Sequence, residues 1–366
     1  MSLSTAVKAG DSFRLQAGAL RERLFLAGGL VTLALIAIVA LGLGAMPVSW
    51  TQVLQVLLPF LPGAEIPDAM TRVVVLEIRL PRVAMAMLVG AGLAICGAAM
   101  QGLFRNPLAD PGLIGVSAGA ALGAVSWIVL ASSLGWLGSL AAVGGALGGQ
   151  FALAVAAFLG GLATTLVVYA ITLRAGRMGA TATLLLAGIA VSALCGAATG
   201  LLTYVADDAQ LRSVTFWSMG SLGGSDWHGL AVLALLIVPA SIALWRLNRV
   251  LDALLLGEES AGHLGFDLAR IRPVLIVLVA LVVGSAVGLT GMIGFVGLMA
   301  PHIARMMIGP GHRLLMPMSM VVGAILLLAA DSFARTVATP AEIPIGIVTT
   351  LLGGPFFLYL LLRRFG

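Results

Sequence analysis

Apolar runs of about 20 residues recur along the whole chain, and they limit what it can fold into more than any other feature. Runs of this length match a helix that crosses a bilayer. They do not alternate between polar and apolar residues, so a transmembrane barrel is excluded. Only 10% of the residues are charged, whereas a soluble domain needs about a quarter. We therefore expect an all-α integral membrane protein.

About ten transmembrane helices are expected. The first 23 residues are polar and basic, and the apolar run that follows exceeds the core of a signal peptide, so it is interpreted as a retained span. Residues 1–23 form an N-terminal segment, and residues 24–366 form one transmembrane domain with a cytoplasmic segment at 250–272. The expected spans are 24–46, 83–103, 113–132, 139–172, 181–203, 228–246, 273–290, 292–308, 315–334 and 345–362.

The distribution of basic residues predicts the orientation. An even number of spans puts both termini on one side of the membrane. With both termini inside, the inner face holds 15 of the 20 basic residues, and the outer face holds five basic beside eight acidic residues. Basic residues concentrate on the cytoplasmic side of membrane proteins. The net charge of +5 therefore reflects topology and does not indicate nucleic-acid binding.

The energy source must lie outside this chain if it is ATP. Lys8 is the only lysine, so a P-loop, which needs a lysine to contact phosphates, cannot form. The middles of the expected spans carry almost no ionisable side chains, which argues against a proton-coupled secondary transporter. No catalytic residue is predicted.

Cysteine and histidine do not indicate a metal site. The two cysteines lie in the middle of apolar helices and are expected to be packing residues. None of the four histidines is placed convincingly in a transport pathway, so structural roles are favoured over iron ligation. These residues are Cys96, Cys195, His228, His263, His302 and His312.

Dense small residues predict close helix packing. Gly90 to Gly97, the run around Gly144 to Gly149, and Gly160 with Gly161 are spaced for close approach of helix backbones in lipid. Together they indicate a tightly packed bundle of many helices.

Three loops depart from this apolar background. At the outer entry to the second span, Arg79 and Arg82 flank a Leu-Pro step that we interpret as a rigid turn; they either pair with carboxylates of an incoming protein or snorkel to the interface. In the inner turn 104–112, two prolines break the helix, and asparagine and aspartate can cap the next one. In the inner stretch 252–272, two glutamates open a short helix that Gly265 can close.

Several motifs in the same order resemble the FecCD-type permeases, the membrane subunits of type II ABC importers for cobalamin, ferric siderophores and haem. The resemblance covers nearly the whole chain. It is carried by RLPR at 79–82, GAAMQGLFRNPLADPGLIGVSAGA at 97–120, LLLAG at 184–188, LGEESAGHLG at 256–265, GFVGLMAPHIAR at 294–305, ADSFAR at 330–335 and EIPIG at 342–346.

The resemblance implies an assembly in the inner membrane of a bacterium. Two copies of the permease form a homodimer around a central pathway, with two ATPase subunits that bind ATP and Mg beneath it and a periplasmic binding protein above it. The lipid bilayer surrounds the complex. No cofactor is implied to be permanently bound, and haem or another ferric chelate is implied as cargo.

The resemblance also implies roles for individual residues. Docking of the binding protein is assigned to Arg79, Arg82 and Arg335. Coupling to the ATPase is assigned to Glu258, Glu259, Ser260, Ala261, Gly262, His263, Leu264 and Gly265. The cytoplasmic gate is assigned to Asn106, Leu108, Thr181 and Ala182, although a hydroxyl residue is found at the last position in relatives, so a polar contact there is in doubt.

Arg335 has a competing partner in the sequence. Asp331 lies four residues earlier on the same helical face and can pair with it. Because an arginine carries five donors, it can serve both this carboxylate and an incoming one. Docking is favoured through the resemblance.

The cargo is the least constrained prediction. Phe216, Trp217 and Met219 can contact a flat apolar macrocycle, or the aromatic pair can form an ordinary interfacial belt. Haem is ranked first, a ferric siderophore second and cobalamin third. An ATP-independent secondary transporter and a scaffold without transport are the alternatives from other classes.

Overall fold

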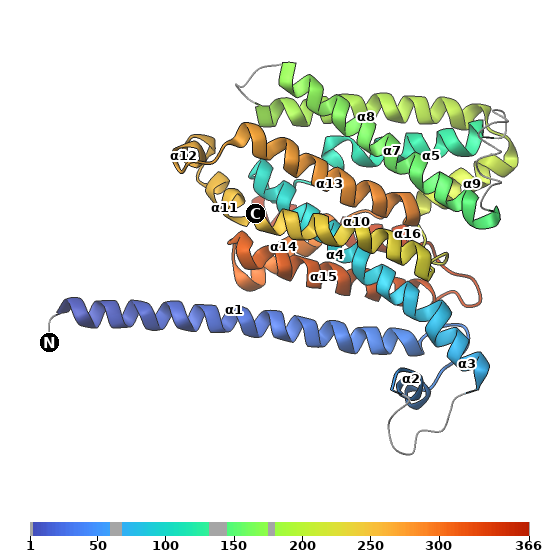
Figure 1. Cartoon of the computed structure of the whole chain (residues 1–366), viewed down its shortest axis with the longest axis horizontal. Coiled ribbons are helices and arrows are strands. Elements are labelled where there is room, and N and C mark those ends of the chain that lie inside the picture. Colours follow the sequence, from blue (N-terminus) through green and yellow to red (C-terminus); the bar gives the residue numbers. More distant parts are fainter. Residues whose placement is uncertain (1–2, 59–67, 132–144, 175–179, 366) are drawn as a thin grey trace.

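The computed structural model describes residues 3–58, 68–131, 145–174 and 180–365, and all regular structure in these ranges is helical (Figure 1). The elements are α1 (Leu3–Gly42), α2 (Trp50–Leu57), α3 (Ala69–Val73), the π-helix η1 (Val74–Arg79), α4 (Leu80–Phe104), the 3-10 turn η2 (Pro111–Ile114), α5 (Val116–Leu130), α7 (Gly145–Arg174), α8 (Ala180–Val205), α9 (Asp208–Met219), α10 (Trp227–Arg246), α11 (Asn248–Leu255), α12 (Glu258–His263), α13 (Leu268–Thr290), α14 (Val296–Ile308), α15 (His312–Ala334) and α16 (Ile345–Phe365).

Each of the ten expected spans overlaps one apolar helix in the described part of the chain. Seven helices are long and apolar enough to cross a membrane, and three shorter apolar helices cover 116–130, 296–308 and 345–360. At 1.5 Å per residue, α5 and α14 reach only about 20 Å, less than the roughly 30 Å of a bilayer core. Non-helical backbone precedes both, at 105–110 and at 291–295. Such backbone is tolerated in a membrane protein where other helices bury it.

The rigid turn expected around Pro81 is wrong. α3, η1 and α4 form one apolar helix over 69–104, so this span begins well before the expected residue 83. Proline lacks an N–H and its ring collides with the carbonyl one turn earlier. The wider π-helical turn of η1 lies directly before Leu80, and the helix continues through Pro81 without a break.

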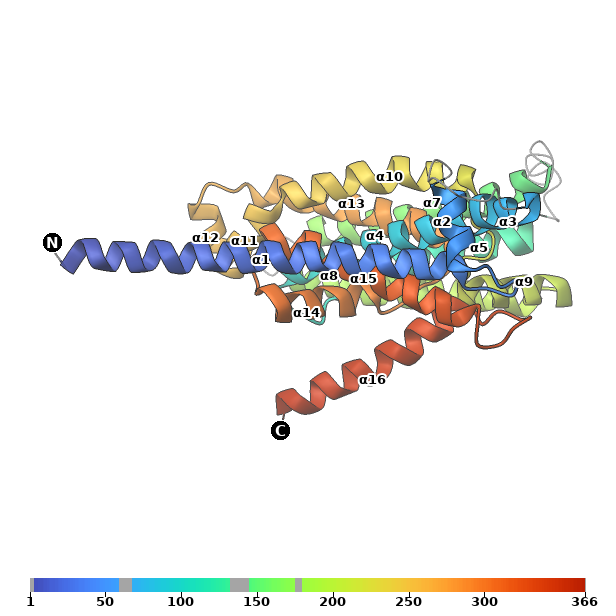
Figure 2. The same cartoon turned by 90° about the horizontal axis from the view of Figure 1, so that it is seen from below.

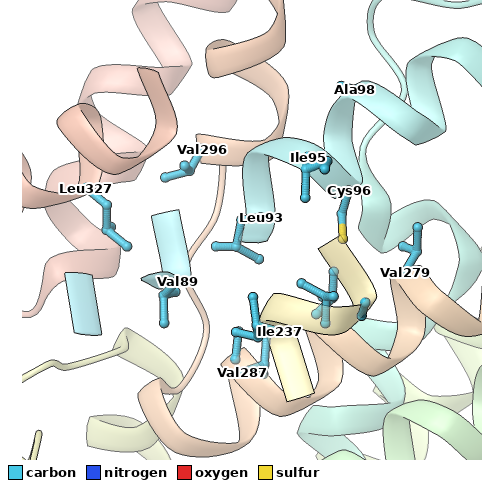
Figure 3. Close-up of a cluster of buried hydrophobic side chains, with 14 of the residues drawn as sticks. Val89, Leu93, Ile95, Cys96, Ala98, Ile237, Val279, Val287, Val296 and Leu327 are labelled. Carbon is cyan, nitrogen blue, oxygen red and sulfur yellow. The ribbon is translucent and has the colours of Figure 1, made fainter. Parts of the chain in front are cut away.

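Helix α4 lies at the centre of the bundle. From Gly92 to Phe104 every residue of α4 is buried. Figure 3 shows side chains of α4 meeting those of α10, α13, α14 and α15 in one apolar cluster. The labelled members are Val89, Leu93, Ile95, Cys96, Ala98, Ile237, Val279, Val287, Val296 and Leu327. Cys96 and Cys195 are both free and buried, as expected of packing residues.

Glycines set the closest helix contacts, as the spacing predicted. A Cβ added to Gly97 of α4 would lie 1.7 Å from the carbonyl oxygen of Gly297 in α14, and one added to Gly90 would lie 2.4 Å from that of Gly323 in α15. Real side chains do not tolerate such distances to backbone. These two crossings therefore hold α14 and α15 directly against α4.

Gly97→Val is expected to destabilise the bundle strongly, because the two helices would have to separate. The cost should exceed the roughly 1–3 kcal/mol of an ordinary overpacked core. Thermal melting of the purified protein in detergent measures it. The matched control is Gly28→Val in α1, where an added Cβ meets nothing within 4 Å. Equal melting temperatures for the two variants would contradict this packing.

Two helices at the edge of the bundle are only partly covered. Figure 2 shows α16 diverging from the other helices toward its C-terminal end, and α8 presents leucines such as Leu194 and Leu201, both 70% exposed. The beginning of α1 and the end of α16 lie toward the end of the molecule that carries α11 and α12 (Figures 1 and 2). Following the orientation that the basic residues predict, we call this end the inner end, and we call the opposite end, which carries α2, α3 and α9, the outer end.

Candidate functional site

The outer end holds a cluster of buried charges around Asp331. The carboxylate of Asp331 is fully buried and accepts hydrogen bonds from Arg82, from Nε at 3.0 Å and from Nη2 at 2.9 Å. Nη1 of Arg82 donates to Oε1 of Glu342 at 2.9 Å. Glu342 remains 46% exposed and is the outermost member of the chain of contacts. A fork of guanidinium donors between two carboxylates is a strong, directional arrangement.

Two further arginines donate hydrogen bonds to backbone carbonyls at the outer end of α1 and just beyond it. Arg79 donates to the carbonyl oxygens of Leu41 at 2.7 Å, Gly42 at 3.0 Å and Met46. Arg335 donates to the carbonyl oxygen of Ala40 at 2.6 Å. Helix ends leave carbonyl groups without intrahelical partners, and these guanidinium groups satisfy them.

The three arginines assigned to docking thus have partners within the chain. Their exposed fractions are 5% for Arg79, 9% for Arg82 and 5% for Arg335. The expected pair of Arg335 with Asp331 is present, at 3.6 Å, but Arg82 is the nearer partner of that carboxylate. Arg335 lies just beyond the end of α15, where burial lowers the pKa of its guanidinium and Asp331 opposes the shift. Docking remains a proposal.

The expected short helix at the inner end is confirmed as α12. Gly257 at φ +115° precedes it, and the two glutamates form its first turn. It closes in a Schellman arrangement, with Gly265 at φ +86° and hydrogen bonds from the N–H of Gly265 to the carbonyl of Gly262 and from Phe266 to Ala261. A glycine at each end supplies the backbone angles that other residues rarely adopt.

Helix α12 has one buried side and one exposed side. Ala261 is fully buried, whereas the exposed residues of the segment are Glu259, Gly262, His263, Leu264 and Gly265. Oε1 of Glu258 forms an ion pair at 2.5 Å with Nη2 of Arg272 in α13. Glu258 therefore ties α12 to the membrane helix α13, whereas Glu259 is exposed beside the cavity described next.

A cavity of about 610 Å³ separates α12 from the inner ends of α7 and α8. Glu258, Gly262 and Arg272 line one side, and Tyr169 and Leu184 lie on the other. Among the described elements, α12 packs mainly against α11 and α13.

The loop at 104–112, to which the cytoplasmic gate was assigned, is held by side-chain caps, as its asparagine and aspartate predicted. Oδ1 of Asn106 accepts from the N–H of Leu108 at 3.0 Å, and Oδ1 of Asp110 accepts from the N–H of Gly112 at 2.7 Å, so both side chains cap turns. The loop then passes beside α8, where a Cβ at Gly188 would lie 1.9 Å from the carbonyl oxygen of Leu113.

The second gate position is described only in part. Ala182 is exposed on α8, in the same helix that contacts the gate loop through Gly188. Thr181 belongs to α8 by its backbone, and its side chain lies outside the described residues. The two parts of the expected gate thus lie on neighbouring elements.

The aromatic segment borders a cavity of about 180 Å³ near the outer end. Phe216 and Trp217 of α9 line it together with Met85, Phe151 and Thr290. Phe216 is 67% exposed, and the Nε1 of Trp217 is buried without a hydrogen-bond partner among the described residues. Met219 does not line this cavity; its carbonyl packs against Gly346 at the start of α16.

The histidines take separate structural positions. His302 of α14 packs edge-on against Phe356 of α16 at 5.9 Å, and His312 is buried beside Asp252. His228 and His263 lie at the surface. Within the described ranges, no three residues among His, Cys, Asp and Glu gather as a metal site would need.

Four charged partners were not predicted from the sequence: Asp331 for Arg82, Arg272 for Glu258, Glu342 for Arg82 and Asp252 for His312. The last two pairs join residues 260 and 60 positions apart. No local pattern marks pairs of such separation.

Comparison with known proteins covers most of the chain. A family model described as the FecCD transport family matches residues 32–363. The chain is 45% identical over 347 residues to the hemin transport system permease protein HmuU of Yersinia pestis, covering 95% of this chain and 98% of that protein. It is 45% identical over 293 residues to the cobalamin import system permease protein BtuC of Halobacterium salinarum, covering 80% of this chain and 74% of that protein.

The fold is shared with a solved transporter. A metal-chelate type ABC transporter in an inward-facing conformation superposes with a TM-score of 0.78 and 34% identity, covering 92% of this chain and 98% of the other. Sequence and fold agree along nearly the whole length. The chain therefore belongs to the FecCD transport family and is the permease subunit of a type II ABC importer, in which a separate subunit hydrolyses ATP.

Proposed function

We propose that this permease carries haem across the inner membrane of a bacterium. The observation that supports haem most is the match to the hemin permease, which extends over 95% of the chain, whereas the match to the cobalamin permease of equal identity extends over 80%. A ferric siderophore and cobalamin are the alternative cargoes. The exposed Phe216 beside Trp217 offers aromatic surface to a flat macrocycle.

The working unit is proposed to be a homodimer with two ATPase subunits at the inner end and a periplasmic binding protein at the outer end. The apolar, partly uncovered faces of α8 and α16 support a pathway between two copies. The exposed face of α12 supports contact with an ATPase. ATP and Mg are bound by that subunit, and no cofactor is held permanently.

Transport is proposed to proceed by alternating access. A loaded binding protein docks at the outer end, and ATP-driven closure of the ATPases displaces α12. The displacement reaches the membrane helices through the Glu258–Arg272 ion pair. Asn106 and Leu108, with Thr181 and Ala182 on α8, then open or close the inner exit. Each step uses positioning and charge, and no covalent bond in the cargo changes.

Growth of haem-auxotrophic cells tests the cargo. Cells that express this permease with its ATPase and binding protein are expected to grow on low external haem, and cells that lack the ATPase are not. Absence of growth on haem, together with ATPase-dependent uptake of a ferric siderophore or of cobalamin by the same cells, would keep the importer and overturn haem as cargo.

Docking is proposed to begin at Arg82, where an incoming carboxylate replaces Glu342. Glu342 is half-exposed and bonds only the outer nitrogen, while Asp331 holds the rest of the guanidinium. Arg79 and Arg335 hold the end of α1 beside it and add positive potential under the docking face.

Glu342→Gln is therefore expected to raise the affinity of the permease for its binding protein. Removal of one partly exposed competitor is worth up to about 1 kcal/mol, or roughly twofold to fivefold in Kd. Titration of the detergent-purified complex with labelled binding protein measures it. Glu77→Gln is the matched control, since Glu77 is exposed near the same end and shows no ion pair in the part of the chain that the structure describes. An unchanged or weaker affinity for Glu342→Gln would contradict the docking role of Arg82.

A further inference from the structure

Asp252 joins the segment before α12 to the first residue of a membrane helix. Its Oδ1 accepts a hydrogen bond from the backbone N–H of His312 at 2.8 Å and lies 2.8 Å from Nδ1 of the same residue. Asp252 belongs to α11, which leads directly into α12, and His312 begins α15. The carboxylate thus caps α15 and fixes the orientation of the imidazole ring.

The Nε2 edge of the His312 ring packs against Gly102 of α4, where a side chain is absent. The residue is 1% exposed, and a Cβ added to Gly102 would lie only 2.6 Å from its Nε2. Nε2 has no hydrogen-bond partner among the residues described. The contact between His312 and α4 is therefore steric, whereas its contact with α11 is doubly hydrogen-bonded.

This junction lies next to the inner gate loop. Gly102 lies two residues before Phe104, the last residue of α4, and Asn106 lies two residues after Phe104. Leu251 of α11 approaches the same glycine, with a side-chain carbon 3.1 Å from the added Cβ. Farther out, α15 is held against α4 by Gly90 and Gly323. A displacement of α11 therefore acts on α15 and on the end of α4 from which the gate loop begins.

We infer that Asp252 and His312 are positioning residues for transport, which carry movement of the coupling segment to the inner end of α4. The inference rests on the proposed coupling role of α12. The carboxylate is well suited to this role because its hydrogen bonds are partly buried, where they are stronger than in water. Among the described residues, His312 lines neither the cavity beside α12 nor the cavity beside the aromatic segment.

Uptake per ATP hydrolysed distinguishes this role from a purely structural one. The experiment uses proteoliposomes that contain the permease, its ATPase and its binding protein. Asp252→Ala, which removes the cap, and Gly102→Ala, which displaces the ring from the side of α4, are each expected to lower that ratio about tenfold, while ATP hydrolysis continues. Asp252→Asn keeps an oxygen acceptor for the backbone N–H of His312 and is expected to retain most of the coupling.

The control is Asp207→Ala, which removes a comparable helix cap at the outer end. Asp207 accepts from the N–H groups of Ala209 at 2.9 Å and Gln210 at 2.8 Å. Its ratio of uptake to hydrolysis is expected to stay at the wild-type value. The inference is overturned if Asp252→Ala and Gly102→Ala keep the wild-type ratio, or if uptake and hydrolysis fall in proportion. Failure of the cargo proposal is distinguishable, because it appears as absent haem uptake in the wild-type complex.

Discussion

Replacing Glu258 by glutamine is expected to lower ATP-driven uptake about tenfold or more while the ATPase continues to turn over. The charge removed is half of the ion pair with Arg272, at 2.5 Å, which ties α12 to α13. The exposed face of α12 is unaltered, so the ATPase should still bind. Coupling between distant sites is commonly worth about 1–3 kcal/mol, so uptake should fall about tenfold or more. Uptake and phosphate release, measured in the same proteoliposomes, check this.

The neighbouring glutamate provides the matched control. Glu259 lies in the same turn but is exposed, and Glu259→Gln removes the same charge without touching Arg272. We expect it to weaken binding of the ATPase, so that uptake and hydrolysis fall together at low ATPase concentration and recover when the ATPase is in excess. Equal behaviour of the two variants would contradict the assignment of separate roles to the two faces of α12.

Asp331→Ala is expected to be the most destabilising single substitution at the outer end. It would leave the buried guanidinium of Arg82 without its main partner and would remove the carboxylate nearest to Arg335. Breaking one side of a buried ion pair costs about 3–5 kcal/mol, because a charge stays buried without compensation. Thermal or denaturant unfolding of the purified protein measures the loss, and we expect little folded protein at the wild-type melting temperature.

Two variants separate this effect from general sensitivity of the outer end. Glu342→Gln changes a half-exposed partner of the same arginine and should cost about 1 kcal/mol or less. Asp331→Asn retains an oxygen acceptor, so its loss of stability should lie between those of Asp331→Ala and Glu342→Gln. If Asp331→Ala unfolded like the wild type, the buried cluster would not be what holds α4 to α15 at this end.

Much of the fold was predictable because it depends on local patterns. Long apolar runs mark helices in lipid, and each of the ten expected segments contains a helix. The helix at Glu258 was predictable because its signals lie within ten residues: glutamates in the first turn and a glycine after the last. Close approach at Gly90 and Gly97 followed from the same kind of local spacing.

The remaining features depend on contacts that the sequence does not mark. Pro81 suggests a break, but the bundle around α4 keeps the helix continuous through a π-helical turn. The arginines of the outer end were expected to be exposed. No local pattern shows that the carbonyl oxygens of Leu41 and Gly42 accept hydrogen bonds from Arg79. The capping of His312 by Asp252 joins residues 60 positions apart. Such pairs are set by tertiary packing.

The central claim, that this chain is the permease of an ATP-driven haem importer, is tested most directly by uptake into proteoliposomes that contain the chain, its ATPase and its binding protein. Haem, a ferric siderophore and cobalamin are offered separately, with and without ATP on the side of the ATPase. We expect haem alone to accumulate, and only with ATP. Accumulation of another cargo instead of haem, or haem transport indifferent to ATP, would contradict it.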